Sequence, residues 1–201
     1  ILAFGIALLV TWLLVIGTSK SAKVNSVLVA IKIIALTLFI IMALPVATSH
    51  TANFTPFLPG GWGSPLGGIG VLGAAASIFF AYVGFDAIST AAEETKNPNR
   101  NIPIGLIASL AVCTIFYLLV GYAAVGAVGA QPIMGPDGVP LEPGSQAFAA
   151  ACKGSEALVC SHEPLAHVLR LIGWPNLGNW IGVAAILALP SVILMIMLSL
   201  I

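Results

Sequence analysis

Gly84 and Asp86 lie two residues apart in the apolar string FAYVGFD, residues 80–86. A glycine costs a helix about 1 kcal/mol relative to alanine, and a carboxylate at membrane depth costs about 2.5–3.5 kcal/mol on insertion scales. Backbone that leaves the helix at membrane depth is tolerated where it lines a cavity or is buried in protein. We therefore predict a broken helix that binds a small ligand. The predicted binding residues are Phe80, Ala81, Tyr82, Gly84, Phe85 and Asp86.

The alternative for this string is an intact helix. Gly84 would then allow close packing against a neighbouring helix, and Asp86 would lie near the lipid headgroups. Asp86 has no histidine or cysteine companion at membrane depth, so it lacks the converging groups that an embedded enzyme needs. We therefore predict a protein that is not an enzyme.

Lys32 is the second candidate, because it stands alone in the apolar string VLVAIKII, residues 27–34. Its side chain could extend to the cytoplasmic headgroups and serve as an anchor. The other possibility is that it points inward, where desolvation favours the neutral amine and permits proton exchange. The residues alone leave both possibilities open.

The composition places these candidates in a membrane protein. Hydrophobic residues make up 59% of the 201 residues and charged residues only 7%, whereas soluble domains carry about 25% charged residues. Seven lysine and arginine residues balance seven aspartate and glutamate residues. Without a net positive charge there is no electrostatic attraction to nucleic acid, and we exclude nucleic-acid binding.

The apolar segments predict an all-α chain with five membrane-crossing helices, at about 1–16, 27–46, 69–92, 104–128 and 177–201. The third contains the break near 80–86. A crossing needs about 20 residues, so we expect the first segment to be incomplete and the chain to be part of a longer protein.

Basic residues predict the orientation in the membrane. The short loops 17–26 and 93–103 carry Lys20, Lys23, Lys96 and Arg100, and the positive-inside rule places such loops in the cytoplasm. The loops 48–68 and 129–176 are then outside. Apolar spacing in the second outer loop predicts a short helix over 164–173 that lies along the membrane surface or caps the bundle.

The same outer loop contains Cys152 and Cys160, and an external compartment permits a disulfide between them. The sequence leaves the bridge open. His50, His162 and His167 have no spacing that resembles a metal site, so we predict neither metal nor cofactor. Asn53-Phe54-Thr55 matches the glycosylation acceptor pattern, which matters only in a eukaryotic host.

The longer string FFAYVGFDAISTAAEETKNPNRNIPIGL, residues 79–106, resembles the sixth helix and following loop of the amino acid–polyamine–organocation superfamily, in its cationic amino acid transporter branch. The match is specific because the FAYxGFD core, the EE pair, the NP and the IPxG all occur together. The resemblance implies a partial LeuT-type fold, which is built on two inverted five-helix repeats, with helices four to eight present here.

This resemblance implies a multi-pass permease of the cell membrane. It would transport an amino acid, with arginine or lysine favoured, by alternating access with proton coupling or exchange. Its partners would be the substrate, protons and the lipid bilayer. A polyamine permease is less favoured. The remaining alternatives are a non-transporting receptor or subunit, or a truncated fragment that is inactive by itself.

The resemblance also implies roles for residues outside the string's core. The context of Lys32 is similar to the fifth helix of proton-coupled members, where a lysine takes the place of sodium in sodium-driven relatives. Ser191 and Leu194 resemble positions on the eighth helix that face the substrate chamber. The residues implied to cap the broken helix and pack a cytoplasmic gate are Glu93, Glu94, Lys96 and Arg100.

Overall fold

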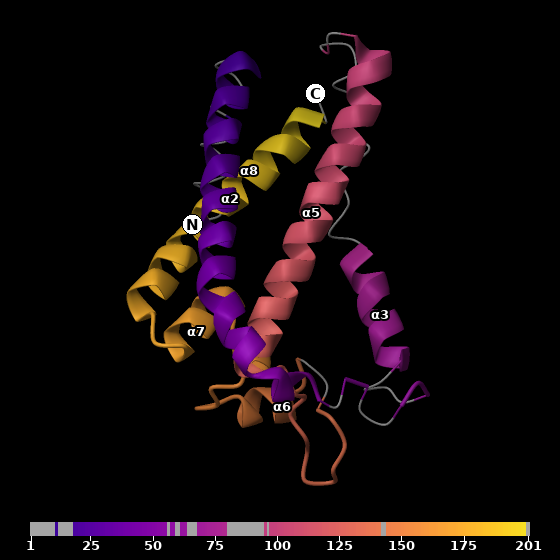
Figure 1. Ribbon diagram of the computed structural model, residues 1–201, viewed down its shortest axis with the longest axis vertical. Helices are drawn as coiled ribbons and strands as arrows, with labels where there is room; N and C mark the ends of the chain where they lie inside the picture. The colour runs from indigo at the N-terminus through magenta and orange to yellow at the C-terminus, as the bar shows by residue number, and fades with distance from the viewer. Residues whose placement is uncertain are drawn as a thin grey trace. The chain divides into compact units, whose positions relative to one another are not determined.

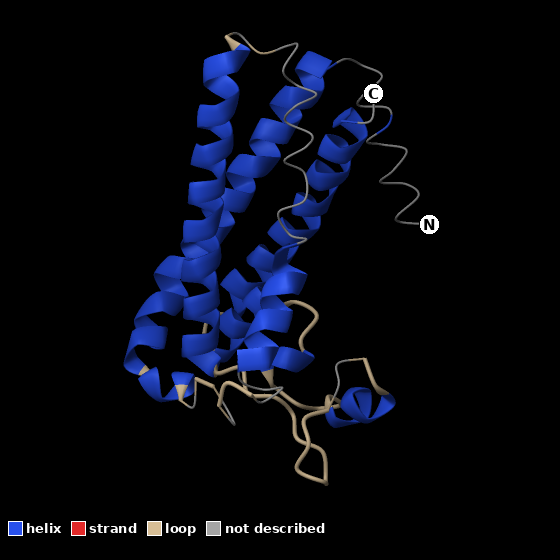
Figure 2. Ribbon diagram, turned by 90° about the vertical axis from the view of Figure 1, so that its right-hand side faces the viewer, coloured by secondary structure: helices blue, strands red, loops and turns tan. Residues whose placement is uncertain are grey.

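The computed structural model describes residues 11, 18–55, 57–58, 61–63, 68–79, 95, 97–141 and 144–199. Helices and loops account for all of this part (Figure 2), and the only β pairing in it is an isolated bridge between Met134 and Pro140. The predicted all-α fold is confirmed.

Four longer helices carry most of the described chain (Figure 1). They are α2 (Thr18–Ser49), α3 (Gly68–Phe79), α5 (Pro98–Val128) and α8 (Pro175–Ser199). The shorter elements are the 3₁₀ helix η1 (Thr51–Phe54), α6 (Gln146–Ala151), the 3₁₀ helix η3 (Leu158–Cys160) and α7 (Pro164–Leu171).

Three segments in the described residues are long and apolar enough to cross a membrane. They are Val24–Ser49, Pro98–Val128 and Pro175–Ile193. A shorter apolar helix covers Gly70–Phe79. The predicted break at 80–86 lies outside the described residues, as does the first predicted crossing apart from Thr11, so the prediction of five crossings remains a prediction.

Two helices begin earlier than the sequence predicted. Helix α2 begins at Thr18 and includes residues 18–26 of the predicted loop, because Ala22 and the lysines favour helix and this stretch contains no glycine or proline. Helix α5 begins at Pro98 instead of residue 104. The amides of Arg100 and Asn101 donate to Asn97 O at 3.1 and 3.0 Å, and a proline fits the first helical position, whose N–H has no helical partner.

The described chain divides into two compact units, and α2, α5 and α8 contribute to both. The first unit consists of Ile1–Leu38, Phe80–Leu118 and Val183–Ile201. The second consists of Phe39–Phe79 and Leu119–Gly182, so it contains η1, α3 and the whole segment from α6 to α7.

The buried apolar cluster belongs to the second unit. Phe39 and Ala43 of α2 pack there with residues of α5, α7 and α8, namely Ala123, Ala124, Val168, Leu169 and Ile181. The alanines let helices approach closely. The predicted outer loop 129–176 is therefore partly folded, and the short helix predicted at 164–173 is α7.

Candidate functional site

Lys32 of α2 and Ser191 of α8 are in contact in the first unit. The Lys32 side-chain nitrogen Nζ donates a hydrogen bond to Ser191 Oγ at 2.5 Å, across 159 residues of sequence. Ser191 is 2% exposed, and Lys32 is partly buried. The structure thus brings together two residues that the sequence analysis selected for different roles.

A second hydrogen bond fixes the direction of the Ser191 hydroxyl. Its hydrogen is donated to the carbonyl oxygen of Ala188 at 2.8 Å, so its lone pairs remain for Lys32. Pro190 precedes Ser191 in the helix and has no N–H, which leaves the carbonyl of Ile186 without its usual helical donor. Ser191 therefore acts as an acceptor at a weakened point of α8.

The contact matters because of its depth in the apolar segment. The span containing Lys32 begins at Val24, so at 1.5 Å per residue Lys32 lies about 12 Å along the helix from that end. A charge this far inside is costly unless it finds a partner. Ser191 supplies a partner inside the protein, whereas an anchoring lysine would direct its nitrogen to the headgroups.

Asn25 is a polar residue that the sequence analysis missed. Its Oδ1 atom is buried and accepts no hydrogen bond from the described part of the chain. Seven residues separate Asn25 from Lys32, so both lie on one face of α2, about 10 Å apart along the axis. A buried acceptor without a partner costs about 1–3 kcal/mol, and such atoms commonly mark the place of a water. The sequence signal that could have identified Asn25 is its i, i+7 spacing from Lys32.

The predicted substrate-binding residues 80–86 lie outside the described residues, as do Glu93, Glu94 and Lys96 of the predicted gate. Their assignments remain predictions. Arg100 is exposed in the first turn of α5, and Leu194 belongs to α8, three residues after Ser191.

In the second unit, Cys152 and Cys160 are joined by a disulfide, with their Cα atoms 5.3 Å apart. Cys152 follows α6 as its C-cap, and Cys160 is the last residue of η3. Within the described residues, no three histidine, cysteine or acidic side chains lie together as a metal site would require.

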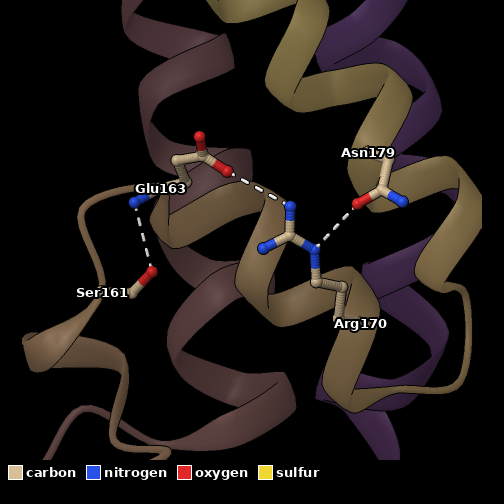
Figure 3. A network of polar contacts seen from close by, with 4 residues as sticks. All are labelled: Ser161, Glu163, Arg170 and Asn179. Atoms are coloured by element: carbon tan, nitrogen blue, oxygen red, sulfur yellow. Dashed lines mark hydrogen bonds and ion pairs between the residues drawn. The ribbon is translucent and has the colours of Figure 1, made fainter. Parts of the chain in front are cut away.

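A charged cluster joins α7 to the first turns of α8 (Figure 3). Arg170 Nη2 donates to Glu163 Oε2 and Arg170 Nε donates to Asn179 Oδ1, each at 3.2 Å. The amide of Glu163 donates to Ser161 Oγ at 3.2 Å. The side chains of Arg170 and Glu163 are 40% and 50% exposed, and a pair so exposed contributes about 0–1 kcal/mol. The cluster supports the packing of the two helices.

Comparison with known proteins shows the family. The sequence profile of the amino acid permease family matches residues 1–158. The branched-chain amino acid permease BcaP of Bacillus subtilis (strain 168) is 44% identical over 135 residues, which cover 67% of this chain and 27% of the relative. Cationic amino acid transporter 1 of Arabidopsis thaliana is 40% identical over 149 residues, which cover 74% of this chain and 23% of the relative.

A third relative has a different printed substrate. The methylthioribose transporter of Bacillus subtilis (strain 168) is 42% identical over 121 residues, which cover 60% of this chain and 24% of the relative. The chain thus spans about a quarter of the length of these relatives. All three are permeases or transporters, as the sequence predicted when it excluded an enzyme. The matched profile and the apolar helices show that the chain belongs to the amino acid permease family of integral membrane proteins.

Proposed function

We propose that the protein containing this chain is a secondary transporter that moves amino acids by alternating access. The family and its named relatives support amino acid transport. Asp86 is the acidic residue of the predicted binding string and would pair with a cationic side chain. Arginine and lysine are therefore the favoured substrates, and the similarity to the branched-chain permease makes leucine the neutral competitor to test.

The contact between Lys32 and Ser191 is the observation that carries the proposal of proton coupling. It joins α2 to α8 through an amine, a group that can gain or lose a proton. A ligand or proton shifts a conformational equilibrium only by its different affinity for the two states. A contact that is stronger in one protonation state supplies such a difference directly.

Protonation changes the strength of this contact. Because the Ser191 hydrogen is held by Ala188 O, Lys32 must act as the donor. A hydrogen bond to a charged group contributes about 1.5–3 kcal/mol, and one between neutral groups about 0.5–1.5 kcal/mol. A difference of about 1 kcal/mol changes a two-state equilibrium about fivefold. Loss of the proton from Lys32 therefore loosens α2 from α8 within the first unit.

Asn25 marks the route that we propose for the proton. A water placed beside its buried Oδ1 atom would lie on the same face of α2 as Lys32, at the end of the span that the basic residues predict to be cytoplasmic. During uptake, a proton released from Lys32 to the cytoplasm would leave along the face of α2 that carries Asn25.

Reconstituted transport tests the proposal. The full-length protein in liposomes is expected to accumulate radiolabelled arginine when the outside is acidic, and to do so more strongly than leucine. Gly84→Leu is expected to abolish uptake, because a bulky side chain fills the space where backbone groups approach the substrate. Gly73→Leu is the matched control, since a side chain at Gly73 meets nothing within 4 Å.

Three results separate the alternatives. Binding of arginine without accumulation would indicate a receptor or subunit. Accumulation that does not depend on the pH gradient would remove proton coupling. Unimpaired uptake by Gly84→Leu would remove residues 80–86 from the binding site.

A further inference from the structure

The disulfide between Cys152 and Cys160 closes a short loop in the second unit, which we call the strap, residues 152–160. One end of the strap is the C-cap of α6 and the other end is the last residue of η3. Both cysteines are partly exposed. Neither cysteine is enclosed in the buried cluster.

The strap holds α7. The carbonyl oxygen of Glu156, in the middle of the strap, accepts a hydrogen bond from His167 Nε2 at 2.8 Å. The η3 end of the strap contacts α7 directly. Leu158 of the strap and Leu165 of α7 both pack against the buried cluster. The closed strap thus contacts α7 both at His167 and at the buried cluster.

Helix α7 in turn packs tightly against α8. A Cβ atom added at Gly178 of α8 would lie only 2.6 Å from the carbonyl oxygen of Ala166, so the two backbones are already as close as a glycine permits. The pairing of Arg170 with Glu163 and Asn179 reinforces the same contact. A displacement of α7 therefore displaces the first turns of α8 as well, and α8 carries Ser191 further along its length.

The strap also forms one wall of a cavity of about 310 Å³ in the second unit. Ala157 and Leu158 line it together with Asn53 after α2 and Gln131 after α5. Asn53 is itself fixed, because its Nδ2 atom donates to Gly126 O at 2.8 Å. The disulfide therefore closes the strap beside this cavity, and opening it would remove one of the constraints on that wall.

We propose that the disulfide is a redox-sensitive covalent constraint that holds α7 in position, and that its reduction by an external dithiol slows transport. A thiolate of the dithiol attacks one cysteine sulfur, the S–S bond breaks, and the departing sulfur takes up a proton. The second thiol of the reagent then displaces the other cysteine. The protein gains two thiols, and the reagent leaves as its cyclic disulfide. The effect on transport rests on the proposed function, whereas the release of α7 does not.

The experiment uses the full-length protein in liposomes before and after treatment with dithiothreitol, with thiol content measured by alkylation and mass spectrometry. Reduction is expected to speed amide hydrogen exchange over residues 164–171 at least about tenfold, because opening of the strap removes the constraint on local unfolding. The initial rate of arginine uptake is expected to fall at least about threefold and to recover on reoxidation.

Two variants make the test specific. The double variant C152S/C160S is expected to behave as the reduced protein and to ignore dithiothreitol. Cys113→Ser removes the free, exposed cysteine of α5 and is expected to keep the full response.

The outcomes are distinct. Unchanged exchange over 164–171 after complete reduction would overturn the proposal. Faster exchange with unchanged uptake would overturn its link to transport. A protein that takes up no amino acid in either redox state would contradict the proposed function, and the exchange measurement would still decide whether the strap holds α7.

Discussion

The two units of the chain are held together by different interactions. In the second unit the buried side chains are apolar, with Phe39, Val168 and Leu169 fully covered, and a disulfide fixes the loop beside them. Among the described residues of the first unit, Ser191 is the one that is buried, and its partner is the ammonium of Lys32.

This difference implies that the stability of the second unit does not depend on protonation, whereas the contact in the first unit does. Burial of apolar surface contributes about 25 cal/mol per Å², whatever the protonation state of the chain. A hydrogen bond from an ammonium changes when the proton leaves. We therefore expect the second unit to keep its packing through a transport cycle, and the contact in the first unit to form and break.

Among the residues that the structure describes, the largest expected effect is that of Lys32→Arg. Arginine keeps a donor for Ser191 but does not lose its proton in a protein, so gradient-driven accumulation of arginine in liposomes should fall by a factor of about 100, while equilibrium binding of the substrate is retained. Lys23→Arg makes the same change on the same helix before the span begins at Val24 and should have no effect. Wild-type pH dependence in Lys32→Arg would leave lysine as an anchor only.

Gly126→Ala should disturb the second unit instead. The new Cβ would lie 2.6 Å from Ala47 Cβ and 2.8 Å from Phe54 Cζ. Overpacking of this kind lowers the free energy of unfolding by about 1–3 kcal/mol. Gly121→Ala on the same helix meets nothing within 4 Å and should be neutral or slightly stabilising. The stabilities of the two purified variants can be compared by thermal unfolding. Equal stability would show that Ala47 and Phe54 move to accommodate the added methyl group at little cost.

Ser191→Ala tests the first unit from the side of the acceptor. It removes the oxygen that receives the Lys32 hydrogen bond and should reduce gradient-driven accumulation about tenfold, the factor that corresponds to about 1.4 kcal/mol. Ser191→Thr retains a hydroxyl and should recover most of the loss. If alanine and threonine behave alike, the hydroxyl is not the partner that matters during transport.

Arg170→Ala should have the smallest effect. The side chains of its ion pair with Glu163 are 40% and 50% exposed, so the loss of stability should be below about 1 kcal/mol and should shrink further at high salt. Thermal unfolding at low and high ionic strength measures it. If the free energy of unfolding fell by several kcal/mol, the contact between α7 and α8 would depend more on the ion pair than on the close backbone approach at Gly178.

Several features of the fold followed from the sequence. The apolar spacing of 164–173 predicted α7, and the apolar segments predicted α2, α5 and α8, which are long and apolar enough to cross a membrane. The starts of α2 and α5 were placed too late, because hydropathy marks the part of a helix inside the lipid and says nothing about helical turns that continue into water.

The candidate site followed in part. Lys32 was selected because a lone charge in an apolar helix is conspicuous, and Asn25 was missed because a neutral amide is not. Ser191 was assigned to the substrate chamber, and the contact with Lys32 gives it a second role. A helical period places a residue on a face but does not identify what that face meets.

The sequence by itself determined that this is a helical membrane chain of the amino acid permease family. The free energy of transferring a segment from water to the membrane is a sum over its residues, so the sequence is enough to calculate it. A long specific string such as 79–106 likewise identifies the family without knowledge of the fold. Only the tertiary structure decided that Lys32 meets Ser191, that Asn25 Oδ1 is buried and finds no donor among the described residues, and that Cys152 is bridged to Cys160. These contacts depend on how helices and loops pack in the folded chain. Packing depends on how well side chains fit together, and residues that fit together can be far apart in the sequence.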